Sequence, residues 1–225
     1  MAPVTEFAYL GLKPNVDMVF LSKSIEVLLE QPGCLRVRSS LVHEDNSKLR
    51  LFVDWEGIEA HQDFTKRPAY EPFKDLLLSG LEGPSSVYHV YLSPFPSTVL
   101  DNAEGKGKSP VAELLHAYFP GGDGYTADQI ASTSKGAQDF LNQLVGLAKQ
   151  STGETAVGWA VEELEFKGEK CRALVIAIGW ESVDAHKKFR ETEDFAKLIP
   201  LLRGLEGLKG MQVSHISNAV HERSN

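Results

Sequence analysis

Histidine and tyrosine side chains in the predicted strands are the first candidates for chemistry. His116 and Tyr118 are two positions apart, so both point to the same face of one strand. His215 lies in the last predicted strand, and His89 holds the same place in the first half. A histidine with a pKa near neutrality beside a tyrosine hydroxyl can serve as a general base with an oxyanion donor. We expect these side chains to converge on one cavity; the alternative is a hydrogen-bonded histidine of the core or rim.

Arginines of the first half form a second polar set. Arg36 and Arg38 share one face of a predicted strand, and Arg50 and Asp54 share a face of the next strand. An arginine inside a barrel could stabilise an enolate or peroxide anion. The alternative is a salt-bridged sheet face that is open to solvent.

A tryptophan and a glutamate form a third candidate set, in the second half of the chain. Trp159 and Glu163 share a face of a predicted strand, where the carboxylate could act as a base beside an aromatic wall. A ladder of surface side chains is the alternative. The residues predicted to bind substrate are thus Arg36, Arg38, Arg50, Trp55, Trp159 and Trp180.

The most specific pattern is a segment that occurs twice. The pattern W-E-x-x-[DE]-A-H-x-x-F begins at Trp55 and again at Trp180, which indicates two copies of one unit. We interpret the segment as architectural: Ser182 can cap a helix, and the two tryptophans end strands and can cover a barrel rim. His61 and His186 are expected beside the buried stripe, partly exposed. The chemistry is then expected where the halves differ.

Each copy has the predicted order strand, helix, strand, strand, helix, strand. The strands are predicted at 4–12, 34–43, 48–55, 86–92, 111–119, 155–166, 170–180 and 211–217, and the helices at 17–31, 58–78, 127–149 and 182–203. Pro68 and Pro72 are expected to break or bend the helix at 58–78. Residues 120–125 are predicted to be a mobile loop that could cover a cavity in the second half. The resulting divisions are a first unit at 1–93, a linker at 94–109, a second unit at 110–220 and a tail at 221–225.

A βαββαβ unit is the ferredoxin-like arrangement, and two of them can cover their apolar sheet faces by packing together. The fold class is therefore α+β, with two tandem ferredoxin-like units forming an intramolecular dimeric α+β barrel. A tryptophan, an acidic residue and Ala-His at a strand-to-helix junction within such a unit resemble the antibiotic-biosynthesis-monooxygenase type of dimeric α+β barrel. This resemblance implies a superfamily of cofactor-free oxygenases acting on aromatic polyketides, haem-degrading enzymes, polyketide cyclases, isomerases and proteins without known chemistry.

Composition excludes several classes of function. The chain has 225 residues with 31 acidic and 23 basic side chains, a net charge of -8 and no run of lysine or arginine, so nucleic acid and anionic membranes are not expected partners. It has neither a signal-peptide pattern nor about 18 consecutive apolar residues, so a cytosolic location without a membrane span is expected. Cys34 and Cys171 are expected to be buried thiols. No metal-ligand spacing appears, so neither a metal nor a cofactor is predicted.

The resemblance implies a cofactor-independent enzyme of secondary metabolism that acts on a phenolic or polyketide-like small molecule, and the residues show that aromatic and basic side chains are available for it. In this hypothesis His116 or His215 helps to form an enolate or phenolate, which reacts with O2 or cyclises. Tyr118 or the arginines would stabilise the developing charge. The alternative is a non-catalytic barrel that binds a hydrophobic ligand or serves a stress response. The chain is expected to act as a monomer that is a pseudo-dimer, or as a homodimer.

Overall fold

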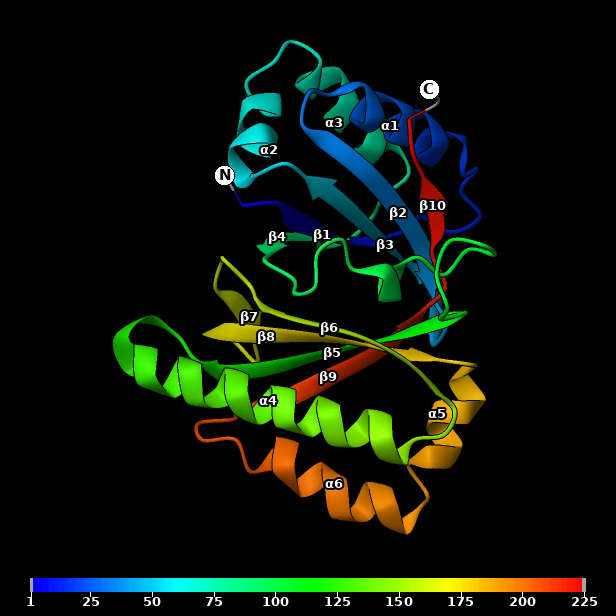
Figure 1. The fold of residues 1–225 in the computed structure, drawn as a ribbon. Helices are drawn as coiled ribbons and strands as arrows, with labels where there is room; N and C mark the ends of the chain where they lie inside the picture. The colour runs from blue at the N-terminus through cyan, green and yellow to red at the C-terminus, as the bar shows by residue number, and fades with distance from the viewer. Residues whose placement is uncertain (1, 224–225) are drawn as a thin grey trace.

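The structure, a computed structural model, describes residues 2–223 and has two α+β units whose sheets face each other (Figure 1). The first unit contains β1 (Val4–Gly11), α1 (Val19–Glu30), β2 (Cys34–Val42), β3 (Asp45–Trp55), α2 (Ile58–Phe64), α3 (Tyr70–Ser79) and β4 (Ser86–Val90). The second contains β5 (Val111–Pro120), η2 (Gly122–Gly124), α4 (Ala127–Leu147), β6 (Ser151–Trp159), β7 (Leu164–Phe166), β8 (Glu169–Trp180), α5 (Val183–Phe189), α6 (Glu193–Arg203) and β9 (Gly210–Ile216). A short helix, η1 (Thr98–Leu100), lies between the units, and β10 (Ala219–His221) follows the second.

Strand order confirms the predicted fold class. The main path of the sheet is β4-β1-β3-β2-β9-β5-β8-β6, so each unit has the same ferredoxin-like order. The units join where Val42 of β2 pairs with Ile216 of β9. Isolated bridges between Val90 and Ala160, and between Ser93 and Val157, connect the other two edges. The two sheets therefore close into one barrel within a single chain.

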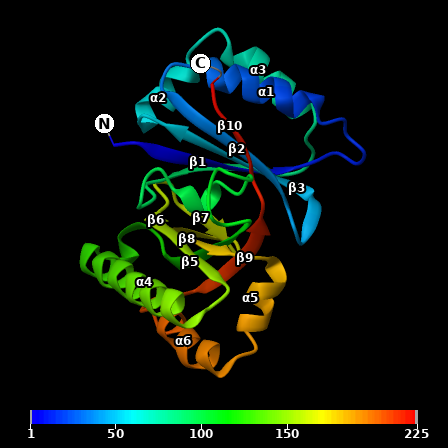
Figure 2. The ribbon, with the colours of Figure 1, turned by 45° about the vertical axis from the view of Figure 1, so that its right-hand side comes forward.

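Alternating side chains divide the core into three layers. In β1, Ala8 and Leu10 pack against the helices of the first unit, whereas Phe7 points into the barrel. The strands of both units follow this period of two because successive side chains of a strand point to opposite faces of the sheet. The helices lie on the outer faces of the two sheets, as Figures 1 and 2 show. Each unit thus has an apolar layer between sheet and helices, and a third layer fills the barrel.

The segment between the units is packed inside the barrel, although its composition predicts a linker. Val99 and Leu100 of η1 are 1% and 0% exposed and belong to the interior layer. Asp101 is buried and forms ion pairs with Arg36 and Arg38 of β2. The middle of the connection, at residues 99–101, is therefore part of the barrel core, whereas residues 104–106 are exposed.

Several element boundaries differ from the predicted ones. The second helix of the first unit is interrupted at residues 65–69, around Pro68, as expected. The second helix of the second unit is also divided, at residues 190–192, where Thr192 caps α6. The predicted strand at 155–166 begins earlier and breaks after Trp159. Part of the predicted tail continues the sheet, since β10 pairs with residues 37–39 of β2.

Both cysteines are buried free thiols, as expected. Among the described residues, no helix is long and apolar enough to span a bilayer.

Candidate active site

Each unit carries a glutamate in its first strand, on the face that meets the helices. Glu6 in β1 and Glu113 in β5 are 9% and 4% exposed. A buried carboxylate needs hydrogen-bond donors, and the tryptophan that ends the third strand of the same unit supplies one. Trp55 Nε1 donates to Glu6 Oε2 at 2.8 Å, and Trp180 Nε1 donates to Glu113 Oε2 at 2.9 Å. The repeated tryptophans therefore hold buried carboxylates on the helix side of the sheet, and the expectation that they cover the barrel rim is wrong.

The histidine of each repeated segment contacts a second histidine on the last strand of its unit. His61 Nδ1 lies 2.8 Å from His89 Nε2, and His186 Nδ1 lies 2.7 Å from His215 Nε2. Because α2 and α5 begin directly after β3 and β8, their first turns carry these histidines back over the strand end. Each helix histidine stacks on the tryptophan of its unit, with ring centroids 5.3 and 4.7 Å apart. The predicted equivalence of His89 and His215 is confirmed, since each pairs with the glutamate of the first strand.

A carboxylate from the opposite unit completes each pair of histidines. Glu162, between β6 and β7, accepts a hydrogen bond from the backbone N–H of His89 at 2.7 Å and contacts its ring Nδ1 at 2.6 Å. Glu44, in the turn between β2 and β3, contacts the backbone N–H of His215 at 3.0 Å and also its ring Nδ1. The side chains of Glu162 and Glu44 are 40% and 45% exposed, so both reach solvent. Two equivalent chains of polar groups therefore run from a buried glutamate to the surface, and each crosses between units.

The order of donors along these chains follows from the carboxylate at the surface. An ionised carboxylate only accepts, so Nδ1 of His89 donates to Glu162 and, in the neutral ring, Nε2 of His89 accepts. His61 Nδ1 then donates to His89, which leaves Nε2 of His61 without a proton. The same argument leaves Nε2 of His186 unprotonated. The geometry thus assigns each helix histidine an unprotonated Nε2.

Burial sets the charge of these groups near neutral pH. Burial lowers the pKa of His61, and it lowers the pKa of His186 to about 3, with the charges of His215 and Arg190 contributing. Burial also raises the pKa of Glu113 to about 7, against the hydrogen bond from Trp180. Both helix histidines are therefore neutral at pH 7, whereas Glu113 exchanges its proton in that range.

The surface carboxylates behave in the opposite way to Glu113. Partial burial acts to raise the pKa of Glu44 and Glu162, but the hydrogen bonds from His215 and His89 outweigh it and lower both values. Both carboxylates are therefore ionised at pH 7, as the order of donors requires.

The helix histidine and the buried glutamate of each unit line a pocket between the sheet and the helices. The first pocket has a volume of about 260 Å³ and includes Glu6 and His61. The second has a volume of about 290 Å³ and includes Glu113, Trp180 and His186. The remaining walls are mainly leucine and phenylalanine side chains of the sheet and helices. An apolar pocket with a few convergent polar groups is the usual form of a small-molecule site.

The predicted histidine and tyrosine pair lies elsewhere, inside the barrel. His116 Nε2 contacts the hydroxyl of Tyr88 at 2.6 Å and that of Tyr9 at 3.2 Å, and burial lowers its pKa to about 3. The ring of Tyr118 lies on the same face, with a centroid separation of 6.3 Å, as predicted. The expected convergence of His116 with His215 is wrong. In the pairing of β5 with β9, His215 stands opposite Glu113, an odd number of positions from His116, so the two histidines lie on opposite faces.

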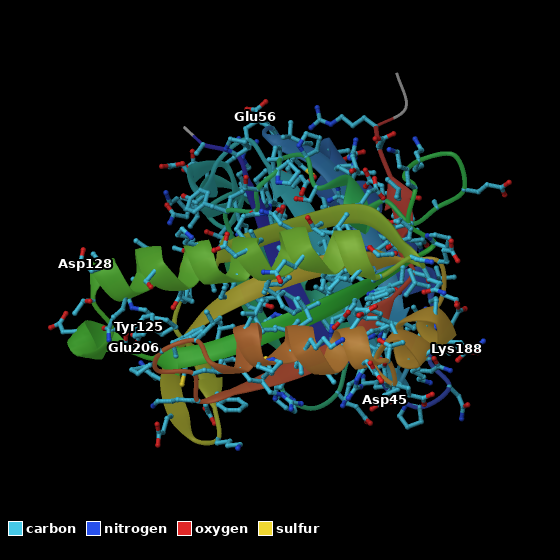
Figure 3. All side chains as sticks on the ribbon, turned by 60° about the horizontal axis from the view of Figure 1, so that its bottom comes forward. Asp45, Glu56, Tyr125, Asp128, Lys188 and Glu206 are labelled. Atoms are coloured by element: carbon cyan, nitrogen blue, oxygen red, sulfur yellow. The ribbon has the colours of Figure 1, made fainter. Side chains whose placement is uncertain are left out.

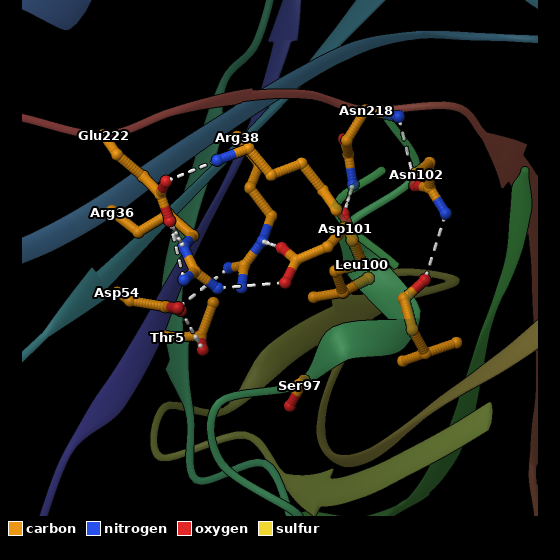
Figure 4. A network of polar contacts seen from close by, with 12 residues as sticks. Thr5, Arg36, Arg38, Asp54, Ser97, Leu100, Asp101, Asn102, Asn218 and Glu222 are labelled. Carbon is orange, nitrogen blue, oxygen red and sulfur yellow. Dashed lines mark hydrogen bonds and ion pairs between the residues drawn. The ribbon is translucent and has the colours of Figure 1, made fainter. Parts of the chain in front are cut away.

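The first-half arginines also belong to the barrel interior (Figure 4). Arg38 is fully buried, with Nη1 at 2.9 Å from Asp54 and Nε at 2.5 Å from Asp101. Arg36 pairs with Asp101 at 2.9 Å and with Glu222 at 2.8 Å. These are structural ion pairs: those of Arg38 are buried between the sheets, whereas the pair of Arg36 with Glu222 is partly open to solvent.

Arg50 is the arginine that reaches a cavity. Its guanidinium carbon lies 3.8 Å from the centroid of the Tyr9 ring. Arg50, Tyr9 and His116 line a third cavity of about 340 Å³ at the mouth of the barrel. This cavity is separate from the two pockets between sheet and helices.

The third candidate set is not brought together. Because β6 ends at Trp159, Glu163 does not share a strand face with it, and Trp159 Nε1 instead donates to Ser134 on α4 at 2.9 Å. Glu163 accepts a hydrogen bond from the backbone of Gly122. The loop predicted to cover a cavity, at residues 120–125, is held by a hydrogen bond: the Tyr125 hydroxyl donates to the carbonyl of Glu206 at 2.9 Å (Figure 3). Residues 120–125 are not among those that line the second pocket.

The sequence contained a signal for the residues that were missed. Glu6 and Glu113 hold the same position in the first strands of the two halves, in Val4-Thr5-Glu6 and Val111-Ala112-Glu113, and a comparison of the halves beyond the repeated segment would have found them. His61 and His186 lie within the repeated segment but were interpreted as architectural. Glu44 and Glu162 follow the second strand of each half, yet their partners lie in the other unit.

The first unit also holds a set of groups that could bind a metal ion. Glu6, His61 and His89 each offer one ligand atom, and these atoms lie within 4.8 Å of one another. The 2.8 Å separation of the two imidazole nitrogens is a hydrogen-bond distance. In the second unit Glu113 lies 3.4 Å from Nε2 of His186, on the opposite side of the ring from His215. The two units therefore share the hydrogen-bonded chain, and the convergent ligand atoms are a feature of the first.

Comparison with known proteins supports the fold. No protein-family model and no curated protein sequence matches the chain. A structure described as an anthrone oxidase-like protein aligns with a TM-score of 0.62 and 10% identity over 99% of this chain and 94% of that one. A candidate monooxygenase from Lactobacillus acidophilus aligns with a TM-score of 0.59 and 9% identity over 99% and 97%. One from Fusobacterium nucleatum aligns with a TM-score of 0.58 and 10% identity over 99% and 95%. These matches confirm that the chain shares its two-unit α+β fold with these proteins.

Proposed function

We propose that the chain is a cofactor-independent enzyme that removes a proton from a phenolic or polyketide-like molecule in the pockets between sheet and helices. The observation that carries the proposal is the neutral histidine in each aromatic pocket, whose ring is linked through a second histidine to an ionised carboxylate. The tandem fold shared with an anthrone oxidase-like protein supports the same substrate class. A role in secondary metabolism, as a monomer with two internal pockets, is part of this proposal.

The proposed reaction begins with proton transfer to the helix histidine. Nε2 of His186 takes the substrate proton, its Nδ1 proton moves to His215, and the charge is neutralised by Glu44 at the surface. This transfer avoids a lasting imidazolium in a buried site, which the low pKa of His186 disfavours. In the first unit His61, His89 and Glu162 have the same roles.

The substrate carbanion then reacts with O2. Its electron pair forms a C–O bond to dioxygen, and protonation of the peroxide anion gives a hydroperoxide. Loss of water from that hydroperoxide converts a CH2 group into a carbonyl, so one oxygen atom enters the product and the other leaves as water. Cyclisation of the same carbanion onto a carbonyl of the substrate is the variant of this reaction that consumes no O2.

The cavity at the barrel mouth is a weaker location for this chemistry. His116 is already engaged by two tyrosine hydroxyls, and within residues 2–223 no carboxylate is bonded to its ring. The pKa of Tyr9 is raised to about 12 by burial, so it is a poor proton donor. We therefore propose His61 and His186, in place of His116 and His215, as the bases.

A non-catalytic hydrophobic-ligand protein is the second candidate. The low pKa of His186 favours it, because a nitrogen that binds protons so weakly is a poor base unless the relay acts. In that case the pockets bind aromatic molecules without turnover.

Aerobic incubation with 1,8-dihydroxyanthrone under ¹⁸O2, with mass spectrometry of the product, tests the proposal. We expect enzyme-dependent incorporation of one ¹⁸O atom and a loss of turnover of at least about 100-fold in the double variant His61→Ala/His186→Ala. His116→Ala is the matched control and should keep turnover. Full activity in the double variant, or loss in the control alone, would return the assignment to the barrel interior. Binding of anthrone without any product would favour the second candidate.

A further inference from the structure

The two pockets differ in charge where they open to solvent. Arg190 and Arg203 line the second pocket, and both are exposed. In the first unit the residue that follows the repeated segment is Thr65, and the residue before the shared Gly-Leu-Glu-Gly sequence is Ser79. Neutral side chains therefore stand where the second unit has two guanidinium groups.

The two arginines have open donors. Among residues 2–223, neither Arg190 nor Arg203 takes part in an ion pair. Lys74 is the lysine that lines the first pocket, and its ammonium lies 2.6 Å from Glu71 on the same helix. The arginines of the second pocket therefore form no ion pair within residues 2–223, whereas the lysine of the first pocket is paired.

The position of Arg190 relates this charge to the reacting groups. Its charge acts against burial at Glu113, and it adds to the effect of burial on His186. Glu113 and His186 are buried and Arg190 is exposed, so the pocket has a polar reacting end and a cationic mouth. Phenylalanine, leucine and isoleucine side chains line the space between them.

We propose that the second pocket is selective for aromatic molecules that carry a carboxylate, whereas the first pocket takes neutral ones. The proposal rests on the proposed function in that both pockets bind substrate. A guanidinium group binds a carboxylate through two parallel hydrogen bonds, and the rings of such a ligand fill the apolar space. Its acidic C–H or O–H group would then face Glu113 and His186. The duplication thereby gives one chain two substrate preferences.

The size of the effect follows from the exposure of the arginines. Ion pairs open to water are weak and are screened by salt. We therefore expect the second pocket to bind a carboxylate about tenfold more tightly than its neutral amide, which corresponds to about 1.4 kcal/mol. At 0.5 M NaCl the preference should fall towards onefold.

Indole N–H resonances can report on the two pockets separately in one sample. Trp180 lines the second pocket, and Trp55 donates to Glu6 of the first. Titration of ¹⁵N-labelled protein with 2-naphthoate or 2-naphthamide at low salt gives a dissociation constant from each resonance. We expect the naphthoate preference at Trp180 and none at Trp55. The variant Arg190→Gln/Arg203→Gln should abolish the naphthoate preference at Trp180. Lys74→Gln is the matched control and should leave that preference unchanged.

The outcomes separate this proposal from the proposed function. Equal binding of the two probes at Trp180, or a preference that survives in the double arginine variant, would show that the pocket binds ligands without charge selection. A naphthoate preference at Trp55 as well would also overturn the proposal. No shift of either indole resonance with either probe at millimolar concentration would count against both the selectivity and the substrate pockets.

Discussion

Glu44 of the first unit binds His215 of the second through both the ring and the backbone nitrogen of the histidine. Glu162 binds His89 in the same way in the opposite direction. The catalytic groups proposed for each pocket therefore depend on a carboxylate that belongs to the other half of the chain. This arrangement makes the role of the two carboxylates directly testable.

Replacing Glu44 by glutamine should disturb the second pocket alone. The amide is neutral and can donate as well as accept, so it no longer requires Nδ1 of His215 to carry the proton. We expect a change of tautomer at His215 and His186 in ¹⁵N NMR, with about 10- to 100-fold loss of turnover in that pocket. Glu162→Gln is the matched variant and should shift His89 and His61 instead. An unchanged tautomer in both variants would rule out this role.

The pKa of Glu113 should produce a pH dependence of stability. Burial raises this pKa from 4.5 to about 7, so the folded state binds the proton more tightly than the unfolded state. The associated stability is fully present below pH 4.5 and is lost as the pH rises through 7. We expect the free energy of unfolding of the wild type to fall by roughly 2–3 kcal/mol relative to Glu113→Gln between pH 4.5 and 8. Urea denaturation at several pH values measures this difference, and parallel profiles would contradict it.

Removing the buried arginine of the barrel should destabilise the whole fold. Arg38→Ala leaves Asp54 and Asp101 buried without their cation, so we expect a loss of about 3–5 kcal/mol in the free energy of unfolding. Arg36→Ala is the control, because the Arg36 side chain is 23% exposed and its loss should cost about 1 kcal/mol. Similar losses in the two variants, measured in urea, would show that the buried pairs do not hold the segment around Asp101 in place.

The repeated segment predicts two copies of one unit, and the periods of the helices and strands predict the ferredoxin-like order within each copy. Both could be recognised because they are local properties of the sequence. The face of the sheet on which each side chain lies was harder to predict. A single-residue difference in strand parity places His116 and His215 on opposite sides of the sheet, and only the pairing of β5 with β9 defines that parity. The partners of Glu44 and Glu162 depend on which strand edges meet between the units, which no local pattern encodes. Likewise, the composition of residues 94–109 predicts a linker, but Val99 and Leu100 fill the barrel because that space needs apolar side chains.

Glu44 and Glu162, which each contact a histidine of the opposite unit, also link the evolution of the two halves. A substitution at Glu162 lies in the second half of the chain but affects the pocket of the first. A substitution at Glu44 lies in the first half but affects the pocket of the second. Neither half is complete as an independent copy, since the carboxylate bonded to its strand histidine belongs to the other half. The two halves of the duplicated chain are therefore expected to evolve together, because a mutation in one half changes the pocket of the other.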